Sequence, residues 1–186
     1  SATGSTQMGK ELAPIVSARL GKLLLELGGN NAAIVCPSAD LDLTIKGIAF
    51  SACGTTGQRC TSLRRLFVHE DIYEDCTKRL QKCFDELIIG CPTKESSQIG
   101  PLISEGSFNS MQETINSLKN KGITMFGGDR IEIEDPKEFY VKPALVLVNE
   151  IEEEMLSETF APILYVKSYK NIEEAIQMQN NVSQGL

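Results

Sequence analysis

Apolar and polar residues at the start of the chain switch between the spacing of a helix and that of a strand. Residues 8–20 follow a helical pattern and lead into the apolar run LLLELG at 23–28. A GGNN turn separates this run from a second extended segment, AAIVC, at 32–36. Ser38 can then cap a helix whose apolar positions end at Ala49. The pattern therefore predicts alternating helices and strands.

The alternation continues through the rest of the chain, which shows no internal repeat. The segment RRLFVH at 64–69 is extended, and Asn171 is placed to cap the last helix. This order of elements favours an α/β fold, a sheet covered by helices. Further helices are expected at 72–88, 106–121 and 171–180, and further strands at 122–126, 140–148 and 162–169.

Composition and charge narrow the class of protein. A chain of 186 residues, 41% of them hydrophobic, can bury the core of one domain or slightly more. The net charge of −7 and the scattered Lys and Arg argue against nucleic acid and anionic lipid as partners. We expect a soluble intracellular protein, since neither a membrane span nor a signal pattern is apparent. The chain begins at Ser1 rather than Met and stops without a capping signal, so we expect a piece of a longer protein.

Six cysteines raise the question of disulfides, but a hydrophobic chain of this length does not need them. No two cysteines form a C-x-x-C pair, and His69 is the one histidine. The Cys/His clusters of structural zinc therefore cannot be assembled. We expect reduced thiols and no metal.

The segment TGSTQMGKE is the first candidate for chemistry, because Gly4, Gly9 and Lys10 match the G-x-x-x-x-G-K phosphate loop. The match fails at Glu11, where a nucleotide hydrolase needs Ser or Thr to hold magnesium. The small residues that open the helix, Gly4, Ser5 and Thr6, can still leave amides and a hydroxyl free for a pyrophosphate. An ordinary helix start explains the same residues equally well.

Glu26 is the second candidate, since leucines flank it and two glycines follow shortly after. Ionised glutamate is rarely buried unless it is paired, so we expect Glu26 at the end of a strand. In a cleft this carboxylate could accept a proton near neutral pH. A strand residue that points to solvent is the simpler interpretation.

Cys60 is the third candidate, in the loop GTTGQRCTS between a predicted helix and a predicted strand. Free cysteines usually behave as small hydrophobic residues, and Cys76 and Cys83 have the spacing of one helix face. Cys60 instead follows two glycines and Arg59, and nearby cations and oriented amides favour a thiolate. His69 lies in the next strand, so we expect a carboxylate to be the base. This combination points away from proteolysis.

The motifs LELGGNN, GTTGQRCTS and ETFAPILY, in this order, resemble those of the NAD-dependent aldehyde dehydrogenase superfamily. The GGNN and ETFAPI variants are similar to its antiquitin branch, the α-aminoadipic semialdehyde dehydrogenases. The resemblance covers nearly the whole chain, which corresponds to well under half of such an enzyme. It implies the three-layer α/β catalytic domain of the aldehyde dehydrogenase fold, incomplete at both ends. Residues 1–24 would end the NAD-binding domain, and residues 25–186 would form part of the catalytic domain.

The resemblance also implies a role for residues in each motif. Cys60 would attack the aldehyde carbon, and its backbone N–H would be one oxyanion donor. After hydride transfer to NAD, Glu26 would activate the water that hydrolyses the thioester. Arg59 would hold a carboxylate of the substrate. The implied cofactor contacts are Gly4 and Ser5 at the pyrophosphate, Leu27 beside the nicotinamide, Glu158 at the nicotinamide ribose and Phe160 near the ring.

Two positions depart from the wider family: Ala2 stands where Phe is usual, and Ala161 where most branches have Gly. The expected reaction is oxidation of an aldehyde, such as α-aminoadipic semialdehyde, to a carboxylate. The expected partner is therefore a small aldehyde, in the cytoplasm or the mitochondrial matrix, and complete relatives would be homo-oligomers. We expect little activity from this chain alone. The alternative is a truncated, non-catalytic fragment that only associates with related subunits.

Overall fold

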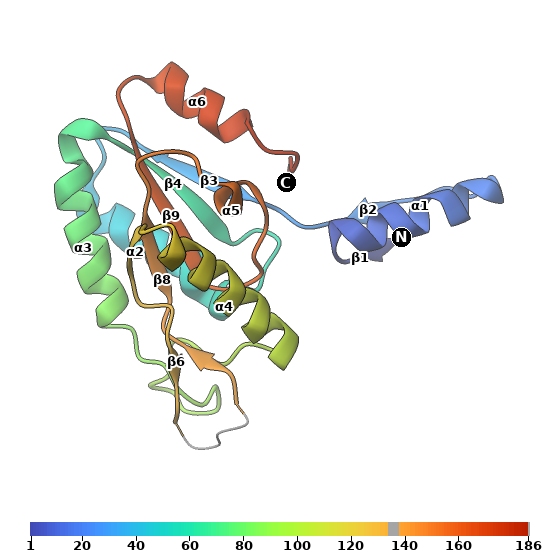
Figure 1. Cartoon of the computed structure of the whole chain (residues 1–186), viewed down its shortest axis with the longest axis horizontal. Coiled ribbons are helices and arrows are strands. Elements are labelled where there is room, and N and C mark those ends of the chain that lie inside the picture. The colour runs from blue at the N-terminus through green and yellow to red at the C-terminus, as the bar shows by residue number, and fades with distance from the viewer. Residues whose placement is uncertain (134–137, 186) are drawn as a thin grey trace.

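The computed structural model describes residues 1–133 and 138–185; residue 186, the last of the expected catalytic domain, lies outside the described residues. A five-stranded sheet forms the centre of the molecule (Figure 1). Four of its strands run parallel, and β5 pairs with β8 in the antiparallel direction at one edge. In spatial order the strands are β3 (Asn31–Val35), β4 (Leu63–His69), β9 (Ile163–Tyr169), β8 (Ala144–Leu147) and β5 (Thr124–Phe126).

Helices cover both faces of this sheet, and each face has its own hydrophobic core. Leu66 and Val68 of β4 lie in the core beneath α2 and α3, whereas Phe67 between them lies in the core beneath α4. The expected three-layer α/β architecture is therefore confirmed. One face carries α2 (Leu41–Cys53) and α3 (Tyr73–Asp85), and the other carries α4 (Glu105–Asn120), α5 (Glu153–Leu156) and α6 (Ile172–Asn180).

Within the described ranges, no helix has both the length and the apolar character needed to cross a bilayer. The longest is α4, with 16 residues.

The first part of the chain forms an arm that stands apart from the sheet (Figure 1). It contains β1 (Ala2–Thr3), α1 (Thr6–Ala18) and β2 (Leu25–Glu26), and the two strands pair in parallel. Gly9 is the buried residue of α1, and a Cβ there would lie 2.6 Å from the Leu27 side chain. Gly9, singled out in the phosphate-loop pattern, thus serves close packing of the helix.

The observed elements agree with most of the expected ones, and Asn171 caps α6 as expected. The helix after β3 is capped by Asp40 rather than Ser38, because the Asp40 carboxylate accepts from the amides of Asp42 and Leu43. The run at 23–28 is shortened to the two residues of β2, since its one partner, β1, is equally short.

The run at 140–148 is interrupted at Pro143, which has no N–H for the ladder. Its first part, β7 (Tyr140–Val141), pairs with β6 (Arg130–Ile131), and its second part is β8. The pattern did not predict α5 or the two short 3₁₀ turns, Gly54–Gly57 and Glu70–Ile72.

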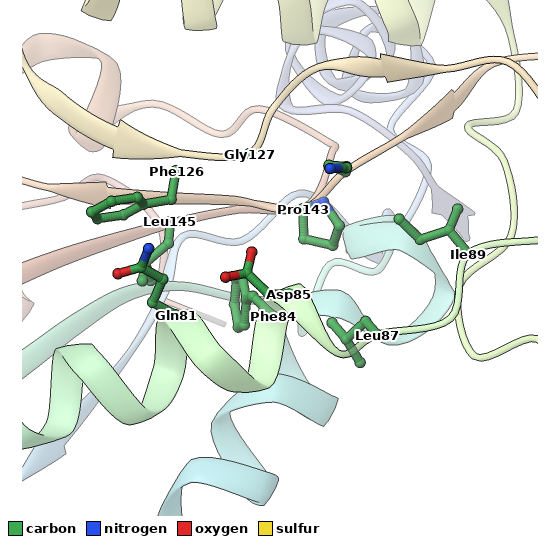
Figure 2. A pocket seen from close by; sticks show the side chains of 10 residues that line it. Gln81, Phe84, Asp85, Leu87, Ile89, Phe126, Gly127, Pro143 and Leu145 are labelled. Atoms are coloured by element: carbon green, nitrogen blue, oxygen red, sulfur yellow. The ribbon is translucent and has the colours of Figure 1, made fainter.

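A small pocket lies between the end of α3 and the strands β5 and β8 (Figure 2). Phe84, Phe126 and Leu145 line it, and Gln81 and Asp85 are its nearest polar side chains on α3. None of the predicted site residues belongs to this pocket, so the candidate chemistry lies elsewhere.

Candidate active site

The three motifs meet because each one directly precedes a strand of the same parallel group. Gly28 and Gly29 come before β3, Cys60 before β4, and Glu158 before β9. These three strands are parallel neighbours, so their amino-terminal ends lie side by side at the same end of the sheet. The Gly29 N–H accordingly donates to Glu158 Oε1 over 3.2 Å. Segments far apart in the chain therefore form one site.

All of the predicted site residues except Glu26 line one cleft between the arm and the sheet. The cleft brings Cys60 together with residues from both other motifs and from the start of α1. Leu27 and Gly28 separate it from a second hollow. The predicted residues in the cleft are Gly4, Ser5, Leu27, Arg59, Cys60, Glu158 and Phe160.

Glu26 lines the second hollow, with Thr6, Lys10 and residues 183–185. It is the last residue of β2, which agrees with the expected position at a strand end. Its side chain is exposed, so the structure brings this carboxylate near the cleft but does not bury it there.

The loop that carries Cys60 begins with an unusual backbone. Thr55, Thr56 and Gly57 are all left-handed, with φ values of 54°, 55° and 66°. This region is strongly disfavoured for β-branched residues, so surrounding contacts must hold the turn in place. The Thr56 hydroxyl donates to the carbonyl of Gly100 over 2.9 Å, and Gly57 packs against the backbone of Ala161. The turn presses the start of the Cys60 loop against the segment that enters β9.

Replacing Gly57 by alanine is expected to lower the free energy of unfolding by about 3 kcal/mol or more. A Cβ at Gly57 would lie 2.5 Å from the Ala161 carbonyl carbon, in addition to the strain of the positive φ. Gly122→Ala is the matched control, because Gly122 has φ +72° with open space around it, and about 1 kcal/mol is expected there. Urea unfolding measures both variants, and equal losses would contradict the predicted clash.

The carbonyl group of Cys60 is fixed from the GGNN turn. Asn31 Nδ2 donates to the Cys60 carbonyl over 2.7 Å and to the Ser62 carbonyl over 3.0 Å. A Cβ on Gly29 would lie 2.2 Å from that Cys60 oxygen, so a glycine is required for this approach. In the described part of the chain no acceptor engages the Cys60 N–H. The predicted oxyanion donor is thus available.

The other cysteines differ from Cys60 in their surroundings, and all six are free. Burial raises the pKa of Cys76 to about 11. Burial also raises the pKa of the Cys53 thiol and of the Cys83 thiol. Cys76 and Cys83 pack in the core beneath α3, as their spacing predicted. These three residues are therefore expected to stay protonated and unreactive at neutral pH.

His69 lies at the far end of β4 and takes no part in the cleft. Its Nδ1 accepts from the Asp71 amide over 3.3 Å, and its ring meets Tyr169 edge-on at 5.3 Å. The interpretation of His69 as a satisfied strand residue agrees with these contacts.

Arg59 is held in a fixed direction beside Cys60. Its Nε donates to the Thr55 hydroxyl over 2.8 Å, and its guanidinium carbon lies 5.7 Å from the centre of the Phe50 ring. The remaining N–H groups of this exposed side chain can serve a ligand in the cleft. A carboxylate is the group that matches the planar fork of an arginine.

Glu158 is held from two sides, by the Gly29 amide and by Arg64, whose Nη2 lies 3.1 Å from Oε1. A Cβ on Gly28 would lie 1.9 Å from Glu158 Oε2. Arg64 is not among the residues that the sequence motifs predict for the site. The sequence does contain a signal for it: two adjacent arginines stand at the start of the apolar strand LRRLFVH. An arginine buried in such a strand needs partners for its charge.

The N-terminus of α1 opens into the cleft, where Gly4 and Ser5 line the wall. Ser5 caps the helix, and its hydroxyl accepts from the Met8 amide over 3.1 Å. The hydroxyl is therefore engaged in the cap, whereas Thr6 and Gln7 hold first-turn amides without an intrahelical acceptor. These amides can bind an anion that enters from the cleft.

Comparison with known proteins adds a family and several relatives. A model of the aldehyde dehydrogenase family matches residues 1–186. The chain is 42% identical over 186 residues to alpha-aminoadipic semialdehyde dehydrogenase of Rattus norvegicus, covering 99% of this chain and 34% of the relative. It is 38% identical to a putative aldehyde dehydrogenase family 7 member A1 homolog of Dictyostelium discoideum, covering 99% and 36%. The chain thus spans about a third of the length of these relatives.

Solved structures show the same fold. The NAD⁺ complex of an aldehyde dehydrogenase from Bacillus cereus matches with a TM-score of 0.93 at 31% identity, covering 99% of this chain and 37% of that one. Betaine aldehyde dehydrogenase from Staphylococcus aureus matches with a TM-score of 0.95 at 24% identity, covering 100% and 38%, and at that identity supports the fold alone.

Proposed function

We propose that this chain, which belongs to the aldehyde dehydrogenase family, is the nucleophile-bearing part of an enzyme that oxidises a semialdehyde to a carboxylate with NAD. The observation that carries the proposal is the cleft in which Cys60, Arg59, Glu158 and Phe160 converge. The thiol can serve as the nucleophile, the guanidinium can bind a carboxylate of the substrate, and Glu158 and Phe160 can contact a cofactor.

The residues of the cleft fit NAD as the cofactor. The amides at the start of α1 suit a pyrophosphate, and Gly4 and Ser5 border them. The carboxylate of Glu158 can accept hydrogen bonds from a ribose, and Leu27 and Phe160 offer apolar surface for the nicotinamide. NAD, when bound, supplies the acceptor for the hydride.

Cys60 begins the reaction by attacking the aldehyde carbon as a thiolate, which forms a C–S bond and places negative charge on the former carbonyl oxygen. The free N–H of Cys60 donates to this oxygen. Loss of hydride from the same carbon restores the C=O group and leaves a thioester on Cys60.

Hydrolysis of the thioester needs a base, and Glu26 is proposed for this step. Glu26 accepts a proton from water, the resulting hydroxide adds to the thioester carbon, and the C–S bond breaks to release the carboxylate and the Cys60 thiolate. Because Glu26 lines the adjacent hollow, its side chain must turn past Leu27 to reach the thioester. Glu158 is the carboxylate that lines the cleft itself, and Arg64 and the Gly29 amide hold it in place.

Arg59 is proposed to select the substrate. Its guanidinium is braced by Thr55 and Phe50 at the mouth of the nucleophile loop, where it can bind a carboxylate at the far end of a semialdehyde. The relative in Rattus norvegicus is named for α-aminoadipic semialdehyde, which carries such a group. We also propose that residues 1–24 end the cofactor domain and that residues 25–186 belong to the catalytic domain.

A chimera tests the proposed function, with this chain replacing the matched segment of the Rattus norvegicus enzyme. We expect NADH formation from α-aminoadipic semialdehyde, measured by absorbance. Arg59→Gln should raise the KM for this substrate about tenfold or more, with little change for an aldehyde that lacks a carboxylate. A chimera that folds and binds NAD but oxidises neither aldehyde would contradict the proposal.

A further inference from the structure

We propose that Arg64 is a positioning residue that joins the Cys60 loop to the Glu158 segment and places a buried positive charge against the backbone of that loop. The inference rests on the proposed function, in which Cys60 is the nucleophile and Glu158 contacts the cofactor. It assigns a role to a residue that none of the three motif interpretations includes.

The contacts of Arg64 divide between the two segments. Toward the nucleophile loop, Nη1 donates to the Gly57 carbonyl over 3.2 Å and Nη2 to the Arg59 carbonyl over 3.0 Å. Toward the other segment, Nη1 donates to the Thr159 carbonyl over 2.8 Å, and Nη2 donates to Glu158 Oε1 over 3.1 Å. One planar group thus fixes the residue before Cys60 and the carboxylate of Glu158 together.

Arg64 is buried, so its charged guanidinium depends on these hydrogen bonds instead of on water. Arg64 is 2% exposed, and burial lowers its pKa, while the negative charges of Glu158 and, to a lesser extent, a Cys60 thiolate oppose that change. The guanidinium is held against two carbonyls of the Cys60 loop, and a cation next to a nucleophilic thiol increases its reactivity. Nε of Arg64 has no acceptor among the described residues, so Glu158 and the carbonyls carry the compensation for this buried cation.

Arg64 also supports Phe160. Its guanidinium carbon lies 5.4 Å from the centre of the Phe160 ring, within the range of a cation–π contact. Lysine could keep the charge but not the fork, because its ammonium group cannot reach acceptors on two sides in one plane. Arg64 therefore has a geometric role and an electrostatic role that substitutions can separate.

The next residue, Arg65, provides a matched control. It is 1% exposed and donates to the Asn30 carbonyl over 2.6 Å and to the Met178 carbonyl over 3.0 Å. Adjacent residues of a strand point to opposite faces, so Arg65 contacts neither the Cys60 loop nor Glu158. Replacing it removes an equally buried arginine without touching the proposed connection.

The test is site-resolved alkylation of the folded chain by iodoacetamide near neutral pH, read by peptide mass spectrometry. In the unsubstituted chain Cys60 should react ahead of the partly exposed Cys36. Arg64→Lys should slow Cys60 about threefold to tenfold relative to Cys36, and Arg64→Met by more than about tenfold. Arg65→Met should lower Tm but keep the ratio of the two rates.

Glu158→Gln should increase the alkylation rate of Cys60, whereas structural damage that disorders the loop should decrease it. Removing this anion leaves the charge of Arg64 less neutralised, so Cys60 should react about twofold faster or more. The acceleration should vanish when Arg64→Met is added, which removes the charge, and should persist at least in part when Arg64→Lys is added. This variant keeps the proposal testable if Arg64→Met does not fold.

The outcomes separate the two proposals. If Cys60 in the unsubstituted chain reacts no faster than Cys36, the proposed function fails at its first step. If Cys60 reacts first but Arg64→Lys leaves the ratio unchanged, or Glu158→Gln slows Cys60, the role assigned to Arg64 is overturned. If Arg65→Met lowers the ratio as much as Arg64→Met, the effect is loss of a buried arginine and the specific role is likewise overturned.

Discussion

Replacing Cys60 by serine in the chimera is expected to lower aldehyde-dependent NADH formation by about 10⁴-fold or more. A serine hydroxyl has nearly the same size, so the loop should keep its contacts to Asn31 and Arg64. Serine is a much weaker nucleophile without a base, and among the described residues that line the cleft there is no histidine to activate it. The expected loss is therefore chemical rather than structural.

Cys36→Ser is the control for this prediction, because Cys36 is also partly exposed but follows β3 at the opposite end of the strand from the cleft. Turnover of that variant should match the parent chimera, and circular dichroism should be unchanged for both. Residual activity above about 1% in Cys60→Ser would show that another group carries the attack.

Glu26→Gln is expected to slow steady-state turnover by about 10²-fold to 10³-fold while leaving the first release of NADH intact. The hydride leaves before water is needed, so oxidation can proceed once per active site. The thioester on Cys60 then accumulates, because a glutamine at position 26 cannot accept the proton of the attacking water.

Stopped-flow absorbance should show a burst of NADH close to one per site, and intact mass spectrometry should show the acylated chain. Glu11→Gln is the control, since Glu11 is an exposed carboxylate on the same arm that accepts a hydrogen bond from Gln7. Unchanged steady-state turnover in Glu26→Gln would place the base elsewhere and would direct attention to Glu158.

Local patterns were sufficient to predict most elements and the motif loops. The amphipathic spacing of α3 and α4 and the apolar runs of β4 and β9 are properties of short segments, and they predicted the elements within a few residues. That the motifs share one edge depends on the order β3, β4, β9 in the sheet. Strand order depends on how the whole chain packs, and the hydrophobic periodicity of single segments does not predict it.

The features that local sequence patterns do not predict depend on partners distant in the chain. Arg64 can be buried only because Glu158 and the carbonyls of the β9 entry lie beside it, 94 positions or more away. Asp40 and Ser38 are both residue types that cap helices well, and α2 begins directly after Asp40. The exposure of Glu26 depends on the arm, whose short strands pair with each other.

The position of β9 in the sheet sets the order in which the site can assemble during biosynthesis. β9 lies between β4 and β8, yet it comes last in the chain among the five described strands of this sheet. Until it inserts, β3 and β4 form one group, β5 and β8 form another, and the inner edges of both are open to wrong pairing. Glu158 and the carbonyls that bind Arg64 arrive only with this strand. A nascent chain therefore carries Cys60 well before it carries the residues that enclose it, so the cleft cannot form until the segment that enters β9 has been made.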